Sequence, residues 1–138
     1  MANFYGHSRT NYFRVDPAKR AAFDAWTERF SLEVHPSDIA EHPDLVCLLP
    51  GDCTDDGTFP RYDFETDTDF DFIETLAGFL APGSVAVIKE VGAEKLRYLS
   101  GWAVAVDHTG KQVVVTLNDI YERAANVFPS AEITRAEY

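Results

Sequence analysis

The fold is decided by residues 85–117, VAVIKEVGAEKLRYLSGWAVAVDHTGKQVVVTL. β-branched and aromatic residues are frequent in this stretch, as they are in strands. Three apolar segments within it are predicted to be strands: Val85–Glu90, Leu96–Val106 and Gln112–Leu117. The tetrapeptide Asp107-His108-Thr109-Gly110 has the composition of a turn and joins the last two. We therefore expect an antiparallel meander, with Gly101 as a candidate bulge.

A helix is expected near the N-terminus, ahead of this meander. Asp16 can cap it, and Pro17 suits its first position, where the missing N–H costs nothing. Apolar residues then recur at helical spacing and define one inward face: Ala22, Phe23, Trp26 and Phe30. The sequence therefore predicts a helix that packs through an aromatic stripe.

Two further helices flank the meander. One is predicted over Phe70–Leu80, with Thr68 or Asp69 as its N-cap, because apolar residues in it recur at helical spacing. The other is predicted over Asp119–Asn126, with Asn118 as its cap. Its residues expected to face the core are Ile120, Tyr121 and Ala124.

Shorter apolar runs complete the expected elements. The predicted additional strands are Phe4–Val15, whose second half alternates from Tyr12 onwards, and Leu32–Val34, Leu45–Leu49 and Ile133–Ala136. Strands in sequence with helices docked on one face are typical of the α+β class. We therefore expect one α+β domain over residues 1–138, with an antiparallel sheet of four to six strands and about three helices packed mainly on it.

Composition favours a cytoplasmic protein. No stretch approaches 18 consecutive apolar residues, and the N-terminus lacks a basic head followed by an apolar run, so neither a membrane span nor a secretory signal is expected. The two cysteines, Cys47 and Cys53, are too few for a disulfide framework. Both thiols are expected to be reduced.

The net charge of −11 is concentrated in one region. Between Phe30 and Ile88 lie thirteen acidic residues and a single base, Arg61, a segment charge of −12. In YDFETDTDFDFIE (residues 62–74) the acids recur at every second position: Asp63, Glu65, Asp67, Asp69 and Asp71. If this segment is extended, all five carboxylates point to one side at intervals of about 6.6 Å, from a rise of roughly 3.3 Å per residue.

Three interpretations of this acidic row stay open. It can be a solvated face that leads into a helix N-terminus, where the dipole favours Asp69, Asp71 and Glu74. It can be a calcium loop, since positions 1, 3, 5, 7, 9 and 12 counted from Asp63 are acidic, although Thr68 stands where such a loop needs glycine. It can also mimic the phosphates of a nucleic acid on a protein that binds one.

Sequence patterns for zinc binding, nucleophilic catalysis and phosphate binding are weaker than the acidic row or absent. His35, His42, Cys47 and Cys53 lack the tight pairs of a structural zinc site, and Cys47 suits a buried position in an apolar run. No nucleophile elbow and no glycine-rich phosphate loop is present. We therefore expect no cofactor, no metal and no catalytic residues, and a protein that is not an enzyme.

Several blocks together resemble a known family. They are ANFYGHSRTNYFRV (2–15), VGAEKLRYLSGWAVAV (91–106), LNDIYERA (117–124) and ITRAEY (133–138). The chain resembles uncharacterised short proteins encoded on bacterial plasmids and integrative elements, which have no established activity. The resemblance implies an accessory role on a mobile element, and the charge is similar to that of antirestriction and anti-CRISPR inhibitors.

The resulting hypothesis is a non-enzymatic module that binds a basic protein surface, on a host complex that processes nucleic acid, without binding nucleic acid or membrane itself. The expected contacts are Asp52, Asp55, Asp56, Asp63, Glu65, Asp67, Asp69, Asp71 and Glu74. One alternative is a calcium-binding or enzymatic domain that uses the carboxylates from Asp63 to Glu74. Another is an accessory protein that oligomerises through a sheet edge or through apolar residues such as Trp102.

Overall fold

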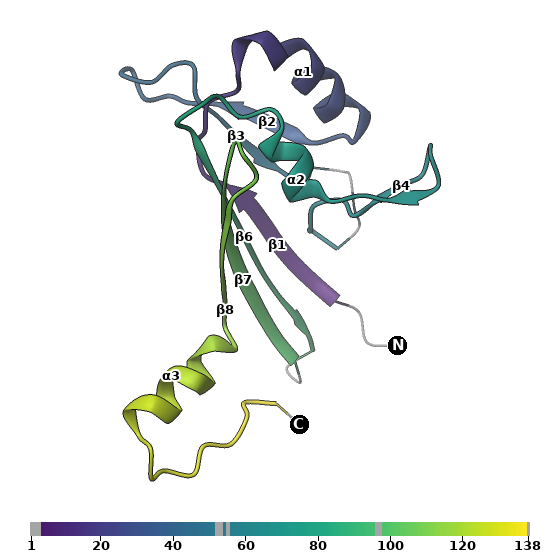
Figure 1. The fold of residues 1–138 in the computed structure, drawn as a ribbon. Helices are drawn as coiled ribbons and strands as arrows, with labels where there is room; N and C mark the ends of the chain where they lie inside the picture. The colour runs from purple at the N-terminus through teal and green to yellow at the C-terminus, as the bar shows by residue number, and fades with distance from the viewer. Residues whose placement is uncertain (1–3, 52–53, 55, 96–97, 138) are drawn as a thin grey trace.

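The protein is an α+β fold built on a four-stranded antiparallel sheet (Figure 1). The computed structural model describes residues 4–51, 54, 56–95 and 98–137. The strand order is β1-β6-β7-β8. These strands span Phe4–Thr10 (β1), Val85–Glu94 (β6), Tyr98–Asp107 (β7) and Gln112–Thr116 (β8). The predicted meander is confirmed, and its first strand extends four residues further than expected.

Gly101 is not a bulge, because the register of β6 and β7 is continuous through the pair Val91–Gly101. The missing side chain has a different use. A Cβ at position 101 would lie 2.8 Å from Cγ and Cδ1 of Leu117, so the glycine leaves room for Leu117 to cross the strand. The candidate bulge is therefore wrong, and the glycine serves side-chain packing.

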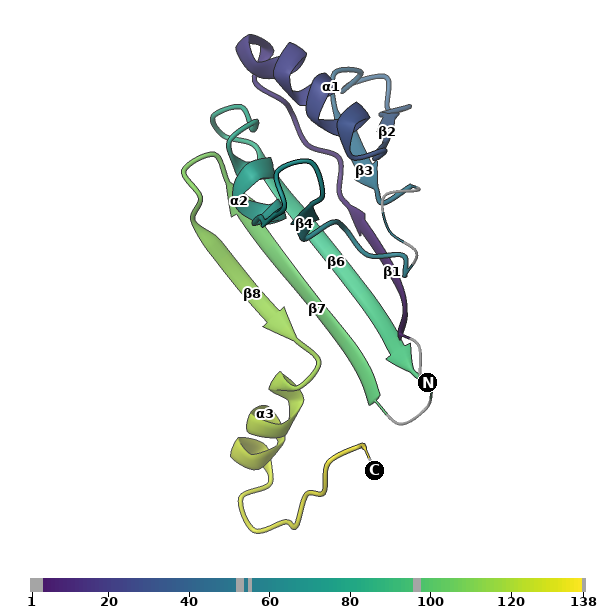
Figure 2. The ribbon, with the colours of Figure 1, turned by 90° about the vertical axis from the view of Figure 1, so that its right-hand side faces the viewer.

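The first two helices lie over the same face of the sheet (Figure 2). A 3₁₀ turn, Pro17–Lys19, precedes α1, Arg20–Arg29, and Asp16 accepts the N–H of Ala18 as predicted. The second helix is shorter than expected: α2 spans Phe72–Ala77 and its N-cap is Asp71. Neither Thr68 nor Asp69 caps it, because both pair in a short strand, β5.

Two small sheets complete this layer. β2 (Glu33–Pro36) pairs with β3 (Val46–Leu49), close to the predicted short strands, and β3 packs beside β1. β4 (Tyr62–Asp63) pairs with β5 (Thr68–Asp69) in a hairpin that projects from the body in Figure 1.

Aromatic rings fill the core between α1, α2 and the sheet. Trp26 of α1 contacts Phe72 and Phe79 with ring centroids 5.3 and 5.2 Å apart, and Phe59 stacks on Phe72 at 4.4 Å. The predicted inward face of α1 is confirmed for Phe23 and Trp26, whereas Ala22 is exposed. Offset and edge contacts between rings add to the free energy gained by burying them.

The third helix does not pack on the sheet. α3 (Asp119–Val127) continues from β8 beyond the end of the sheet, and none of its residues is buried (Figure 1). The expected inward side chain of Ile120 is 58% exposed. Asn118 makes no side-chain cap bond; instead the Asp119 carboxylate accepts the N–H and hydroxyl of Thr116. No helix within the described ranges is long and apolar enough to cross a membrane.

The two terminal strand predictions need correction. At the N-terminus, the predicted strand Phe4–Val15 is confirmed over Phe4–Thr10 (β1), and after Thr10 only two isolated bridges form, from Phe13 to Val46 and from Val15 to Leu80. At the C-terminus, residues 133–136 are not a strand. The Ala136 N–H donates to the Tyr121 hydroxyl at 2.7 Å, which holds this segment against α3.

Candidate functional site

The acidic row does not form an extended line, because it folds back on itself in the β4–β5 hairpin. Tyr62 pairs with Asp69, and Asp63 pairs with Thr68. The Asp63 carboxylate accepts the backbone N–H groups of Glu65 and Thr66 at 3.0 and 3.4 Å, an arrangement typical of aspartate in turns. The condition for a one-sided row, an extended segment, is therefore not met, since the first aspartate helps to form the reversal.

Arg29 of α1 anchors the base of this hairpin. Its guanidinium bonds to Asp63, and its Nε lies 2.9 Å from Glu65. Asp63 is 8% exposed. Burial raises its pKa, but the hydrogen bonds from the Glu65 and Thr66 backbone and from Arg29 outweigh this, and the net pKa lies below the usual aspartate value. The Asp63 carboxylate is therefore ionised, and its bonds stabilise the reversal of the hairpin.

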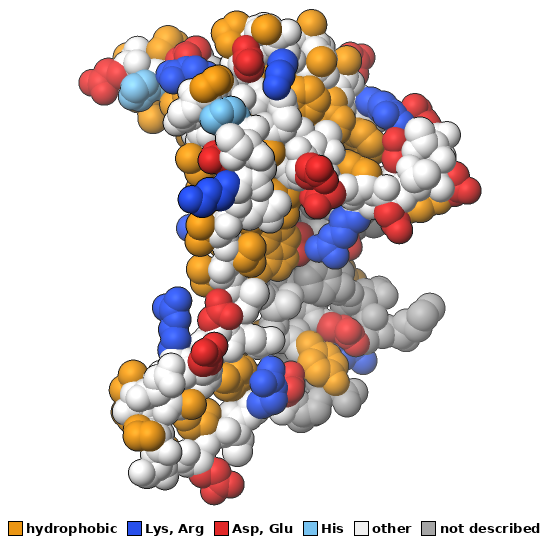
Figure 3. Space-filling model, in the orientation of Figure 1, with side chains coloured by type: hydrophobic (Ala, Val, Ile, Leu, Met, Phe, Trp, Pro, Cys, Tyr) orange, Lys and Arg blue, Asp and Glu red, His pale blue; other side chains and the backbone are white. Residues whose placement is uncertain are grey.

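The hairpin turn presents an exposed aromatic ring beside acidic side chains. Phe64 is 87% exposed, and its ring meets Tyr62 edge-on at 4.9 Å. The Tyr62 hydroxyl donates to Asp67, which raises the pKa of Tyr62. Asp67 has φ of +55°, a conformation that aspartate adopts more readily than most residues. Acidic side chains crowd this projecting hairpin in Figure 3.

The remaining predicted contact residues are dispersed. Asp71 caps α2 by accepting the N–H of Glu74, and Glu74 lies exposed in the first helical turn. Asp56 belongs to the loop against β1, where its carbonyl accepts the Gly6 N–H at 2.8 Å. Burial raises the pKa of Asp56, but hydrogen bonds from Thr58 and Thr54 lower it below its usual value. Asp52 and Asp55 lie outside the described residues.

Neither the calcium loop nor a zinc site has its ligands brought together among the described residues. No three His, Cys, Asp or Glu side chains are grouped to hold a metal ion in the part of the chain that the structure describes. Cys47 is buried, as expected from its apolar run, and Cys53 lies outside the described residues. The carboxylates counted for a calcium loop are separated by the hairpin, with Asp63 turned inward and Asp71 at the helix cap.

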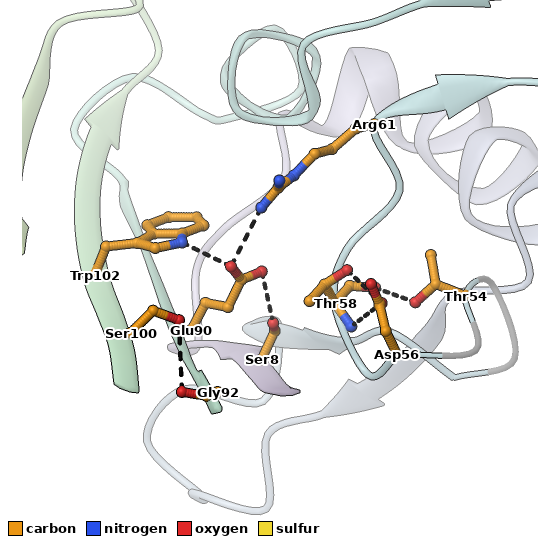
Figure 4. A network of polar contacts seen from close by, with 9 residues as sticks. All are labelled: Ser8, Thr54, Asp56, Thr58, Arg61, Glu90, Gly92, Ser100 and Trp102. Atoms are coloured by element: carbon orange, nitrogen blue, oxygen red, sulfur yellow. Dashed lines mark hydrogen bonds and ion pairs between the residues drawn. The ribbon is translucent and has the colours of Figure 1, made fainter. Parts of the chain in front are cut away.

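The structure reveals a second site, centred on Glu90, that the sequence prediction missed. Glu90 is 5% exposed and lies on the covered face of β6 (Figure 4). Its Oε1 accepts the Ser8 hydroxyl at 3.1 Å. Its Oε2 accepts the Trp102 indole N–H at 2.7 Å and one guanidinium nitrogen of Arg61 at 3.2 Å. The donors come from β1, from β7 and from the segment before β4.

Glu90 and Arg61 line two hollows. The larger, about 520 Å³, lies between α2, the hairpin and the sheet. Its apolar walls are Phe59, Pro60, Phe70, Phe72, Ile73 and Trp102. The smaller, about 430 Å³, is lined by Glu90, Arg61 and Trp102 together with Asp56, Thr58 and Ser100. A largely apolar hollow with a few converging polar groups is typical of a binding site.

A sequence signal for this site existed in the alternation of β6. Ala86, Ile88 and Glu90 share one face of the strand, and the first two are fully buried. A glutamate at the third inward position indicates a buried charge, which needs partners. Its partner Trp102, named above only as an apolar residue for oligomerisation, is half-buried against the core.

Comparison with protein-family models, with curated proteins and with solved structures gives no match for this chain.

Proposed function

We propose that this protein is a non-enzymatic, cytoplasmic binding module whose β4–β5 hairpin engages a basic surface on a protein partner. The observation that carries the proposal is Phe64, which is 87% exposed at the turn of an acidic hairpin. Large aromatic side chains surrounded by polar contacts are typical anchors of protein interfaces. A basic partner surface would meet the exposed carboxylates around that ring.

The hairpin is organised before binding. Arg29 holds Asp63 and Glu65, Asp67 accepts the Tyr62 hydroxyl, and the Phe70 N–H donates to the Arg61 carbonyl at 3.0 Å. A loop that is already ordered loses less conformational entropy when it binds. This ordering supports recognition by the hairpin as a unit.

The partner class that best suits this surface is a nucleic-acid-processing protein of the host, inhibited in the manner of an antirestriction or anti-CRISPR protein. Residues 62–71 carry five acids and no base, so they offer a local negative field to a cationic groove. The folding of the row into a hairpin replaces a linear phosphate-like array by a compact acidic cluster with an aromatic centre. The hairpin would therefore imitate a phosphate backbone through its negative charge and not through the spacing of its acids.

The test compares two doubly neutralised variants as baits. Asp67→Asn with Asp69→Asn removes two exposed hairpin charges, and Asp38→Asn with Glu41→Gln removes two exposed charges from the loop between β2 and β3. Asp71 is left intact because it caps α2. We expect the basic proteins captured from the native host by wild type to be lost from the hairpin variant alone.

A further variant, Phe64→Ser, tests the aromatic anchor, because it removes the exposed ring without changing the net charge. Binding to a captured partner should weaken in this variant and should also fall steeply with salt in the wild type. Equal weakening in both double variants would show that net charge, not the hairpin, attracts the partner. Retention of full binding by Phe64→Ser would remove the anchor from the proposal.

A second candidate function, oligomerisation through the sheet edge, is favoured by β8. This edge strand is exposed along its whole length, with Val113, Val114 and Val115 at 64, 57 and 46%. Exposed apolar edge strands are templates for pairing with another chain. Light scattering on wild type and on Val114→Lys tests it: a dimer that becomes a monomer supports pairing, and a wild-type monomer at high concentration excludes it.

A further inference from the structure

The buried Glu90 carboxylate has an incomplete ionic partner. Among the described residues its one cationic contact is Arg61, whose side chain is 71% exposed while that of Glu90 is 7% exposed. A carboxylate removed from water needs strong compensation. Arg61 supplies it from the solvent side, with most of its own side chain still in contact with water.

The contact between Arg61 and Glu90 involves only one of the guanidinium nitrogens of Arg61. One nitrogen, Nη2, lies 3.2 Å from Oε2, which is longer than the roughly 2.7–2.9 Å of a strong charge-assisted bond. Ser8 occupies one acceptor position on Oε1, and Trp102 occupies one on Oε2. Since a carboxylate offers about four such positions, one remains on each oxygen once Arg61 withdraws. Two acceptor positions that no described residue then occupies, one on each oxygen, match in number the two N–H groups of a guanidinium fork.

The surroundings of Glu90 suit the same group. The indole of Trp102 and the rings of Phe59, Phe70 and Phe72 line the larger hollow, and a guanidinium stacks favourably on aromatic faces. Asp69 and Asp71 lie in the same lining, so the hollow holds three carboxylates and one guanidinium. Figure 4 shows the Arg61 side chain pointing towards Glu90 from above β6, the strand to which Glu90 belongs.

We propose that the hollow beside Glu90 receives an arginine side chain of the partner protein, and that Arg61 occupies the carboxylate as an internal competitor until the partner displaces it. This inference rests on the proposed function for the basic partner, and it adds a specific socket next to the hairpin. Asp69 connects the two, because it belongs to β5 and lines the hollow.

The direct test uses a small probe and the full chain. N-acetyl-arginine-N-methylamide imitates an arginine within a polypeptide, and the corresponding citrulline derivative has the same shape without charge. The chain has two tryptophans, and the Trp102 indole N–H donates to Glu90, so its NMR signal reports on the carboxylate. We expect a saturable shift of this signal with the arginine derivative at millimolar concentration, and none with the citrulline derivative.

Variants distinguish a competitor from a structural residue. Arg61→Ala should tighten probe binding by about fivefold or more, since an occupied site lowers the apparent affinity by the fraction that is open. Arg20→Ala removes the same charge from the exposed pair with Asp24 on α1 and should leave affinity unchanged. Glu90→Gln should abolish binding; because Arg61→Ala changes only an exposed side chain, it decides the question even if Glu90→Gln fails to fold.

Two results with the probe would contradict the socket. Weaker binding in Arg61→Ala, or equal shifts with the citrulline derivative, would overturn the proposal. Free arginine adds a carboxylate that Asp69 and Asp71 of the lining would repel, so it should bind less tightly than the capped derivative; tighter binding would indicate an amino-acid site instead. Probe binding without any effect of the hairpin variants on a partner would leave this socket intact and remove the hairpin function, and the reverse result would remove only the socket.

Discussion

Trp102 and Glu90 face each other across neighbouring strands, and the indole N–H donates to the buried carboxylate at 2.7 Å. Register and hydrogen bond thus coincide in one cross-strand pair. The interaction fixes the carboxylate against β7 through Oε2, the same oxygen that Arg61 contacts. It therefore both stabilises the sheet and orients the proposed socket.

Trp102→Phe should lower the free energy of unfolding by about 1–3 kcal/mol, because it leaves a buried acceptor with one fewer donor. A double-mutant cycle with Glu90→Gln should show coupling, measured by urea unfolding. Trp26→Phe is the matched control: Trp26 Nε1 is buried and has no hydrogen-bond partner within the described residues. Its effect should add to that of Glu90→Gln within about 0.5 kcal/mol; coupling as large as that of Trp102 would contradict the assigned role.

Asp63 should make stability depend on pH in the acidic range. Its pKa is lower in the folded chain than the ordinary value near 3.9, because hydrogen bonds to Glu65, Thr66 and Arg29 outweigh burial. Its contribution is therefore fully present above about pH 4 and is lost as the pH falls through the folded pKa. Unfolding curves of Asp63→Asn should be flatter than those of wild type below about pH 4; an identical slope would exclude this carboxylate as a source.

Gly57 should tolerate alanine far less than Gly83 does. Both have positive φ, +78° and +85°, so both carry the strain that a side chain meets there. A Cβ at Gly57 would lie 1.9 Å from the Gly6 carbonyl oxygen, whereas one at Gly83 would meet nothing within 4 Å. We expect Gly83→Ala to cost about 1–2 kcal/mol and Gly57→Ala clearly more. Equal melting temperatures would show that the loop moves away from β1 freely.

Arg29→Met should loosen the hairpin without removing the aromatic core of α1. The substitution keeps an unbranched apolar stem but leaves Asp63 and Glu65 without their cation. Hydrogen exchange of the amides of Glu65 and Thr66 should accelerate, while that of Ile88 and Val104 in the sheet should not change. Partner binding should weaken as well, because the hairpin would lose its prior order.

The sequence by itself determined the meander, α1 and the short strands β2 and β3. Their signals are local: alternating apolar residues, a proline after a capping aspartate, and a turn at Asp107–Gly110. It also located the acidic segment. In each case the information lies within one element, so the pattern along the chain is sufficient.

Only the tertiary structure decided how the acids are used. Alternation of Asp63 to Asp71 is compatible with a strand or with a reversal, and Arg29, distant in sequence, together with the Asp63 turn bonds selects the reversal. The amphipathic pattern of α3 predicted a buried face, but the chain leaves the sheet after β8, so that none of the helix residues is buried. The Glu90 site joins three segments far apart in sequence, and such long-range pairing of one buried charge with its donors has no local signature.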